Sequence, residues 1–186
     1  MKGNKKVQTS HAAAGEFCCF EWWNRGEMKM KDKVGLETLK QFLVDSNKVG
    51  YAGGEKKKWL KETDGSTTIL FEKSEWRSHD NFFGGEPYGG RTVVFHKDKP
   101  VWMMVYYGWV AEGVETGPVY GVLRNALMRM PENHPFRGPK KYKEGDFIYT
   151  NSWKGEVDRF SGEEQIVQGN QLIYKANYMG GFVNQK

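Results

Sequence analysis

Two apolar runs in the middle of the chain dominate its hydrophobic pattern. Arg91–Phe95 and Pro100–Gly108 are rich in Val, Phe, Trp and Tyr, and the four residues between them are polar. β-Branched and aromatic residues on both sides of a short polar segment predict a β-hairpin. Both alternating faces of the second run are apolar, which is typical of a central strand that is covered on both sides.

The two faces of this second run differ in chemistry. Trp102, Met104 and Tyr106 share one face, and Val105 and Tyr107 share the other. One face suits a helix-packed core, while the indole and phenol groups suit either a fold interior or a ligand pocket. Both interpretations stay open at this point, because burying an aromatic ring is favourable without any ligand.

Two segments have helical periodicity. Leu36, Leu39, Phe42 and Leu43 predict a helix over 35–47. A stronger stripe predicts a second helix, which has a proline in its first turn and ends at Pro131. The residues of this second stripe are Val119, Val122, Leu123, Ala126, Leu127 and Met130.

Other short runs predict strands that are separated by turns. A glycine- and aromatic-rich loop over 82–90 is expected to form the rim of a cavity, and Gly169-Asn170 is a tight hairpin turn. Together these elements predict an α+β fold: a curved, mostly antiparallel, meandering sheet of about six to seven strands with two principal helices packed on it. The further predicted strands are Ser66–Phe71, Glu75–Asn81, Phe147–Asn151, Glu156–Phe160, Glu164–Gln168 and Gln171–Met179.

Domain organisation is predicted to be simple. Residues 34–186 are expected to form a single α+β domain, because this length buries a substantial core. Residues 1–33 have no lasting periodicity and are predicted to be a non-native or disordered extension, with the authentic start at Met28 or Met30. The rival hypothesis is an N-terminal arm that packs Trp22 and Trp23 on the domain.

Charge and cysteine content bear on the partners and the cellular location that we expect for the protein. The formal net charge is +5, but residues 1–33 carry seven Lys and Arg against four Asp and Glu, so residues 34–186 are nearly neutral. Nucleic-acid binding by this domain alone is therefore not expected. Adjacent Cys18 and Cys19 are the only cysteines, which excludes a structural disulfide and favours a reducing, cytoplasmic location. No apolar run is long enough to span a membrane.

Several segments taken in order resemble a known family. They are LKQFLVDSNKVGYAGG, the loop from Asp80 to Gly90, PVWMMVYYG, HPFRGP and YMGG. Over about Leu36 to Val183 the chain resembles the bacterial family catalogued as domain of unknown function 5680. Members of that family stand alone or follow a helix-turn-helix of the XRE repressor class. The resemblance implies a module that accompanies transcription regulators and senses or binds a ligand, and it assigns no reaction.

The chain departs from the family pattern at two positions. Thr92 stands where relatives often have a carboxylate, and Val105 stands where they often have Asn. The resemblance implies that a function carried by those polar groups is altered or lost in this chain. Residues 1–30 show no helix-turn-helix.

Ionisable residues beside the glycine loop are the first site candidates. Arg77 and His79 are expected on one strand face and Asp80 on the other. An Arg–His pair can bind an anion or act in acid–base chemistry, or it can be an ordinary exposed strand edge. Arg137, in a proline-stiffened connector, suits a bidentate contact to an anion or a structural ion pair with Glu163 or Glu164.

No sequence feature predicts a cofactor or a metal. His96 and His134 have no neighbours at metal-ligand spacing, and the Gly-Gly pairs lack the strand–glycine–helix context of a phosphate-binding loop. We therefore expect no cofactor.

The expected function is binding or sensing of a small molecule, including an anionic one, in an aromatic pocket on the sheet. One alternative is an enzyme with His79 as acid/base, Asp80 or Glu164 as its partner and Arg137 as anion clamp. Another is a protein- or nucleic-acid-interaction module that uses the basic loop Lys56–Lys61 with Trp59. The oligomeric state stays open. The expected ligand-binding residues are Trp76, Arg77, His79, Trp102, Tyr106, Arg137, Tyr149 and Tyr178.

Overall fold

The computed structural model describes residues 30–50 and 59–184, with side chains from residue 35 onward. In these residues the chain forms two α-helices and nine β-strands. Of the proposed extension over residues 1–33, residues 1–29 lie outside the described residues, and with them the candidate start Met28 and the arm that carries Trp22 and Trp23. Residues 30–33, from the other candidate start Met30, form the beginning of α1. The elements are α1 (Met30–Val49), β1 (Trp59–Lys61), β2 (Thr67–Lys73), β3 (Trp76–Phe83), β4 (Tyr88–His96), β5 (Lys99–Val110), α2 (Thr116–Leu127), β6 (Lys141–Glu144), β7 (Phe147–Glu156), β8 (Arg159–Gln168) and β9 (Gln171–Phe182).

All nine strands belong to one antiparallel sheet, in the order β1-β2-β3-β4-β5-β9-β8-β7-β6. Two meanders, β1–β5 and β6–β9, meet where β5 pairs with β9. The predicted α+β class and antiparallel sheet are confirmed, but the predicted count of six to seven strands is wrong. The prediction missed β1 and β6, which have three and four residues. Both are short, lysine-containing edge strands, and such strands are too short to show a clear alternation.

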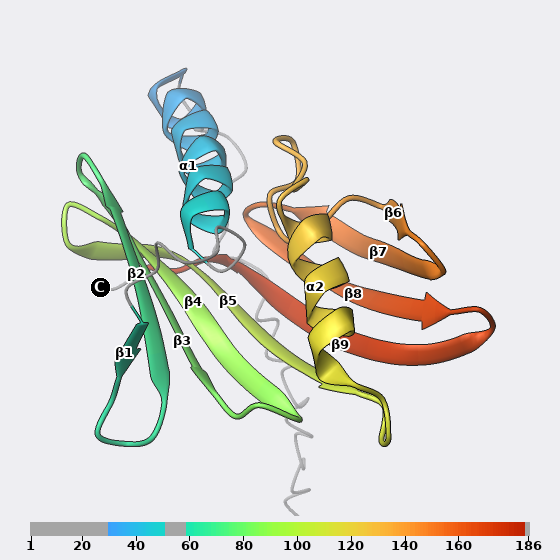
Figure 1. The fold of residues 1–186 in the computed structure, drawn as a ribbon. Helices are drawn as coiled ribbons and strands as arrows, with labels where there is room; N and C mark the ends of the chain where they lie inside the picture. Colours follow the sequence, from blue (N-terminus) through green and yellow to red (C-terminus); the bar gives the residue numbers. More distant parts are fainter. Residues whose placement is uncertain (1–29, 51–58, 185–186) are drawn as a thin grey trace, which may run out of the picture.

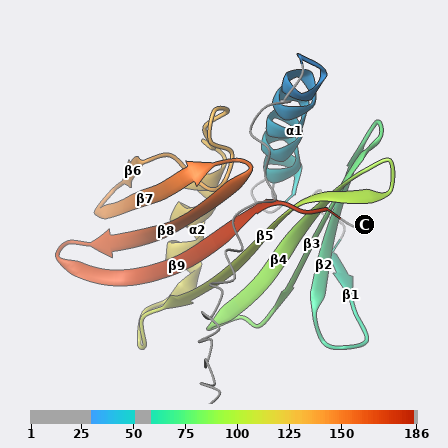
Figure 2. The ribbon, with the colours of Figure 1, turned by 180° about the vertical axis from the view of Figure 1, so that it is seen from behind.

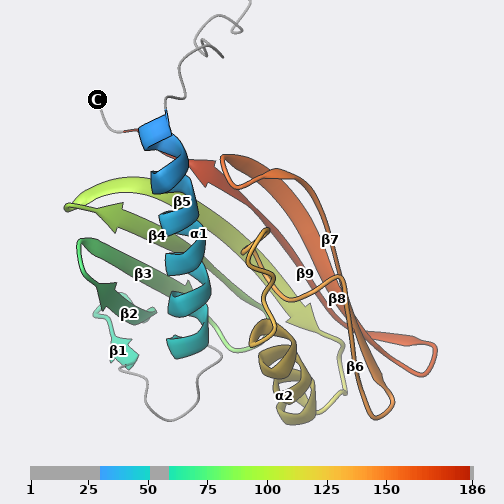
Figure 3. The same cartoon turned by 90° about the horizontal axis from the view of Figure 1, so that it is seen from above.

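Both helices pack on the same face of the sheet (Figure 1). Seen from above, the sheet bends around them, with α1 over the first meander and α2 over the second (Figure 3). The apolar stripe of α1, around Phe42, packs on Val94 and Trp102, and the stripe of α2, around Leu123, packs on Ile166. The side-chain amide of Asn47 joins the two helices by donating to the carbonyl of Leu127 at 2.7 Å.

The predicted central hairpin is confirmed. Lys97 and Asp98 turn with φ of 51° and 61°, as a type I′ turn requires, and β5 is the fifth of nine strands. The prediction that both faces of β5 are covered is wrong. Val105 and Tyr107 are 40% and 56% exposed, on the face opposite the helices. Figure 2 shows the sheet from that side. Both helices lie on the Trp102 side of the sheet, so we call the other side the open face.

The strand predicted over 156–160 is also wrong. The chain turns at Val157-Asp158, and residues 159–168 form one continuous strand, β8. Gly162 lies inside β8, and the ring of Tyr178 on β9 occupies the space above it.

Candidate functional site

On the helix-covered face, β4 and β5 each place a tyrosine opposite a glycine of the other strand. Tyr88 pairs with Gly108, and Tyr106 pairs with Gly90. A Cβ atom at Gly90 would lie 2.7 Å from the Tyr106 hydroxyl, and one at Gly108 would lie 2.8 Å from the Tyr88 ring. These glycines therefore let both phenol rings lie across the sheet. We call this set of four residues the pocket crossing.

The same arrangement recurs between β8 and β9. Phe160 pairs with Gly180, and Tyr178 pairs with Gly162. A Cβ atom at Gly162 would lie 2.3 Å from the Tyr178 ring, and one at Gly180 would lie 2.8 Å from the Phe160 ring. Both rings are buried, and Phe136 stacks on Phe160 with ring centroids 4.0 Å apart. We call this set of four residues the sealed crossing.

A buried ion pair lies close to both crossings. Arg137, in the connector between α2 and β6, donates to Glu164 Oε1 from Nη2 at 2.5 Å and from Nε at 3.0 Å. The Glu164 side chain is fully buried, and that of Arg137 is 12% exposed. The hydroxyls of Tyr149 and Tyr174 each donate to the same carboxylate at 2.7 Å. Of the alternatives for Arg137, the ion pair with Glu164 is the one that forms.

The neighbouring Glu164 carboxylate keeps Arg137 positively charged. Burial by itself would lower the pKa of Arg137, but the Glu164 carboxylate beside it raises that pKa well above its ordinary value. Burial, followed by the negative charge of Glu164, also raises the pKa of Tyr149 and of Tyr174. All three groups therefore stay protonated and serve as hydrogen-bond donors.

Asp80 of β3 is a further acidic residue on this face. Its Oδ1 accepts hydrogen bonds from the Tyr106 hydroxyl at 2.7 Å and from the Thr92 hydroxyl at 3.0 Å. Burial raises the pKa of Asp80 above its ordinary value, although these two hydrogen bonds and the positive charge of Arg137 act in the opposite direction. Burial, followed by the charge of Asp80, also raises the pKa of Tyr106.

Asp80, Tyr106 and Arg137 line one pocket with a volume of about 180 Å³. The three residues also border a smaller cavity of about 70 Å³ on the α1 side. Mostly aromatic walls with a few polar groups are the usual make-up of a small-molecule site. The other residues that line the larger pocket are Trp59, Phe82, Gly84, Gly85, Tyr88 and Tyr120.

The glycine loop, expected to be a cavity rim, does border this pocket. Tyr120 of α2 holds the loop in place, because its hydroxyl donates to the Glu86 carboxylate and to the carbonyl of Gly85. Glu86 also accepts from the backbone N–H of Val110 at 2.7 Å. The rim is thereby tied to both α2 and β5.

Of the residues expected to bind a ligand, Tyr106 and Arg137 lie together in this pocket. Trp102 is 1% exposed and donates its indole N–H to the carbonyl of Val157 at 2.9 Å, so it lies in the core. Tyr149 and Tyr178 are also buried.

The remaining expected ligand residues lie away from the pocket. The ring of Trp76 stacks on His96, with centroids 4.4 Å apart. Arg77 and His79 are on the open face, and the Arg77 guanidinium lies 4.7 Å above the Phe95 ring. His79 pairs with Leu70 and Val93 in the sheet, on the face opposite Asp80. His79 therefore shares no site with Asp80, Glu164 or Arg137.

Several residues of the pocket were missed in the sequence. Tyr88 and Tyr120 line the pocket but were not among the candidates. Tyr88 is also hydrogen-bonded to Tyr174, with 2.6 Å between the two hydroxyl oxygens. The available signal was the spacing aromatic-x-Gly. This spacing is present at residues 88–90, 106–108, 160–162 and 178–180, which are the positions of the two crossings, and also elsewhere in the chain, for example at 136–138 and 153–155.

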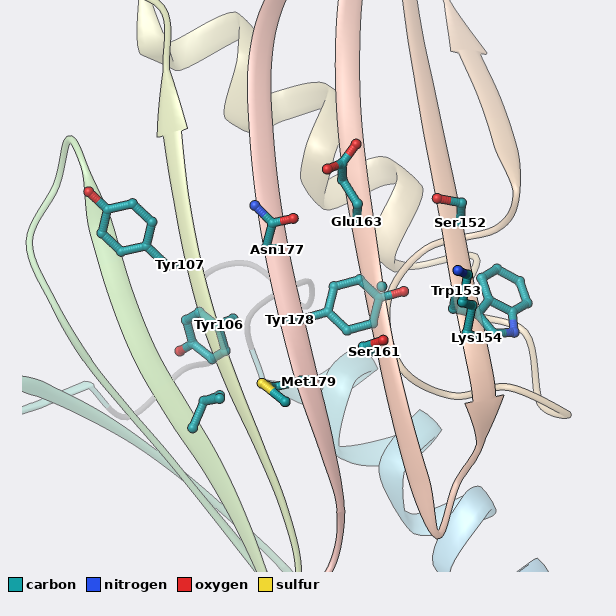
Figure 4. A pocket seen from close by; sticks show the side chains of 12 residues that line it. Tyr106, Tyr107, Ser152, Trp153, Lys154, Ser161, Glu163, Asn177, Tyr178 and Met179 are labelled. Atoms are coloured by element: carbon teal, nitrogen blue, oxygen red, sulfur yellow. The ribbon is translucent and has the colours of Figure 1, made fainter.

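The open face carries a shallow groove of about 670 Å³ over β5, β9, β8 and β7. Figure 4 shows Tyr107, Asn177, Glu163 and Ser152 side by side on these strands, in the order of their cross-strand pairing. Glu163 is paired with Lys175 at 2.7 Å. This groove is an exposed sheet surface, and it lacks the buried charged groups that distinguish the pocket on the helix side.

Residues 30–50 and 59–184 contain no group of three or more His, Cys, Asp or Glu that is arranged to hold a metal ion. Neither of their two helices combines the length and the apolar character needed to cross a membrane.

The chain forms an α+β domain with a small, aromatic-walled pocket on one face of an antiparallel sheet. The model of a family described as domain of unknown function (DUF5680) matches residues 80–183, which is more than half of the chain. The chain belongs to this family, and the resemblance seen in the sequence is confirmed. Searches of curated proteins and of solved structures found no match. The matched region begins at Asp80 and includes Tyr106 and Arg137.

Proposed function

We propose that this domain binds a small, ring-bearing molecule in the pocket lined by Asp80, Tyr106 and Arg137. The observation that supports this most strongly is the meeting of two charged side chains with aromatic walls in one pocket of about 180 Å³. An apolar cavity of about 150 Å³ is known to hold a benzene molecule. The pocket therefore suits a ligand with a single ring and a small polar substituent.

The charge balance favours a neutral or cationic ligand over an anionic one. The charge of Arg137 is already matched by buried Glu164, and Asp80 adds a further carboxyl group. An incoming anion would meet two acidic side chains and one cation. We therefore no longer propose Arg137 as an anion clamp.

The other two functions lose their structural basis or stay predictions. The enzyme hypothesis needs His79 beside Asp80 or Glu164, and His79 lies on the other face of the sheet. The interaction hypothesis used the basic loop before β1. Lys56, Lys57 and Lys58 of that loop lie outside the described residues, so this hypothesis stays a prediction.

A matched pair of variants tests the proposed function. Tyr106 and Tyr107 are neighbours in β5, but Tyr106 lines the pocket on the helix side and Tyr107 is 56% exposed on the open face. A library of one-ring compounds is screened against the parent protein by ligand-observed NMR. Binding that Tyr106→Phe weakens and Tyr107→Phe leaves unchanged supports the proposal. If no compound binds, or if Tyr107→Phe alone weakens binding, the proposed site is wrong.

A further inference from the structure

The polar groups of the pocket are held in place before any ligand arrives. Two N–H groups of Arg137 are engaged by Glu164, and its guanidinium lies 5.8 Å from the centre of the Tyr106 ring. Asp80 is fixed by the hydroxyls of Tyr106 and Thr92. Because both side chains are already oriented, a ligand need not order them, and this lowers the entropic cost of binding.

Each of the two charged groups keeps one hydrogen-bonding atom available. Asp80 Oδ2 and Arg137 Nη1 make no hydrogen bond within the described residues, whereas Asp80 Oδ1 and the Arg137 Nε and Nη2 atoms do. Among those residues, only Arg77 Nε is both fully buried and without a partner. Asp80 Oδ2 and Arg137 Nη1 are therefore accessible, on two side chains that line the same pocket.

The two available atoms have opposite requirements. A carboxylate oxygen needs a donor, and a guanidinium N–H needs an acceptor. A carboxylate ligand satisfies Arg137 but places a negative charge near Asp80. An ammonium ligand satisfies Asp80 but places a positive charge near Arg137. A neutral group with a donor next to an acceptor satisfies both without charge repulsion.

We propose that the ligand presents a planar, neutral amide edge, with its N–H directed to Asp80 Oδ2 and its C=O directed to Arg137 Nη1. Aromatic carboxamides and cyclic amides on a six-membered ring have this edge. The ring lies among Phe82, Tyr88 and Tyr120, which offer aromatic faces and edges to it. This inference rests on the proposed function of the pocket and narrows it to one class of ligand.

Three compounds with the same ring and different edges test the inference. Benzamide, benzoate and benzylamine are titrated separately into the 15N-labelled protein at pH 7, and the backbone amides of Gly84 and Gly85 report on the pocket. We expect benzamide to shift these signals with an affinity about tenfold or more above that of the two charged compounds, because each of those leaves one polar group unsatisfied. In Asp80→Asn, benzoate should gain affinity relative to benzamide.

The outcomes separate the inference from the proposed function. Tighter binding of benzoate than benzamide would mean that Asp80 holds a proton and donates it, and the amide assignment would be overturned while the pocket stands. Tighter binding of benzylamine would overturn it by showing that Asp80 dominates. If none of the three compounds shifts the pocket signals, the proposed function fails together with the inference. The comparison of the three compounds on the parent protein tests the amide assignment even if Asp80→Asn does not fold.

Discussion

The pocket crossing and the sealed crossing are built from the same parts and have different environments. Each has two aromatic residues facing two glycines across an antiparallel strand pair. In the sealed crossing, Phe160 is covered by Phe136 and Trp102, whose ring centroids lie 4.0 and 5.6 Å from its own. In the pocket crossing, Tyr88 and Tyr106 are half-buried and line a pocket.

This difference shows that the glycines make room for the aromatic rings, whereas the neighbouring side chains determine whether core or pocket forms above them. Apolar rings fill the space above the sealed crossing, which gives core. Above the pocket crossing the neighbours are Asp80 and Arg137, whose hydration and charge resist close apolar packing. Glu164 connects the two regions, because it lies two residues from Gly162 in β8 and accepts hydrogen bonds from Arg137 and from Tyr174, whose hydroxyl is hydrogen-bonded to that of Tyr88.

The largest loss of stability is expected when the ion pair between Arg137 and Glu164 is broken. Glu164→Gln leaves the buried guanidinium of Arg137 without a counter-charge, which should lower the free energy of unfolding by about 3–5 kcal/mol. Glu163→Gln on the same strand is the control, since its exposed pair with Lys175 should contribute at most about 1 kcal/mol. Urea denaturation measures both. Equal losses in the two variants would contradict the buried ion pair.

Substitution of a glycine in each crossing should destabilise both. Gly162→Ala and Gly90→Ala each force a ring to move, with an expected cost of about 1–3 kcal/mol, and only Gly90→Ala should also weaken ligand binding. Gly121→Ala in α2 is the control, because a Cβ there meets no atom within 4 Å. Removing a helical glycine should stabilise the protein by up to about 1 kcal/mol. Thermal unfolding that shows no loss at Gly162 would contradict the close ring contact.

One aromatic substitution in each environment should separate stability from binding. Trp102→Phe removes a donor that satisfies the buried carbonyl of Val157, so it should cost about 1–3 kcal/mol and leave ligand affinity unchanged. Tyr106→Phe removes one donor to Asp80, so it should cost about 1 kcal/mol and weaken ligand binding. Denaturation and NMR titration of both variants provide the test. A loss of binding in Trp102→Phe but not in Tyr106→Phe would mean that the ligand binds beside Trp102 and that the proposed pocket is wrong.

The smallest expected effect is the pH dependence of stability that comes from Asp80. Because burial raises the pKa of Asp80, the folded state binds its proton more tightly than the unfolded state does. The contribution of Asp80 is therefore most favourable at low pH, and it declines as pH rises from about 3.9, the ordinary Asp value, through the raised pKa. Asp80→Asn removes this term, so the stability of the parent relative to the variant should fall with rising pH across that window. A difference that rises with pH would show that the pKa is lowered instead.

Local patterns in the sequence determined much of the fold. Period 3.6 located α1 and α2, and the dense run of β-branched and aromatic residues located the β4–β5 hairpin and its central place in the sheet. These features were predictable because the side-chain period follows from the geometry of the backbone. The edge strands β1 and β6 were not predictable, since runs of three and four residues, with one and two lysines respectively, carry almost no periodic signal.

The site depended on tertiary structure. Alternation correctly separated His79 from Asp80, but it could not say which face the helices cover, and so it assigned His79 and Arg77 to the pocket. Arg137 and Glu164 are 27 residues apart, and the sequence offered Glu163 and Glu164 as equal partners. The fold selects Glu164, because its side chain is on the buried face of β8 while that of Glu163 is on the open face, paired with Lys175. Which carboxylate meets a cation depends on which face of the strand is buried, and only packing decides that.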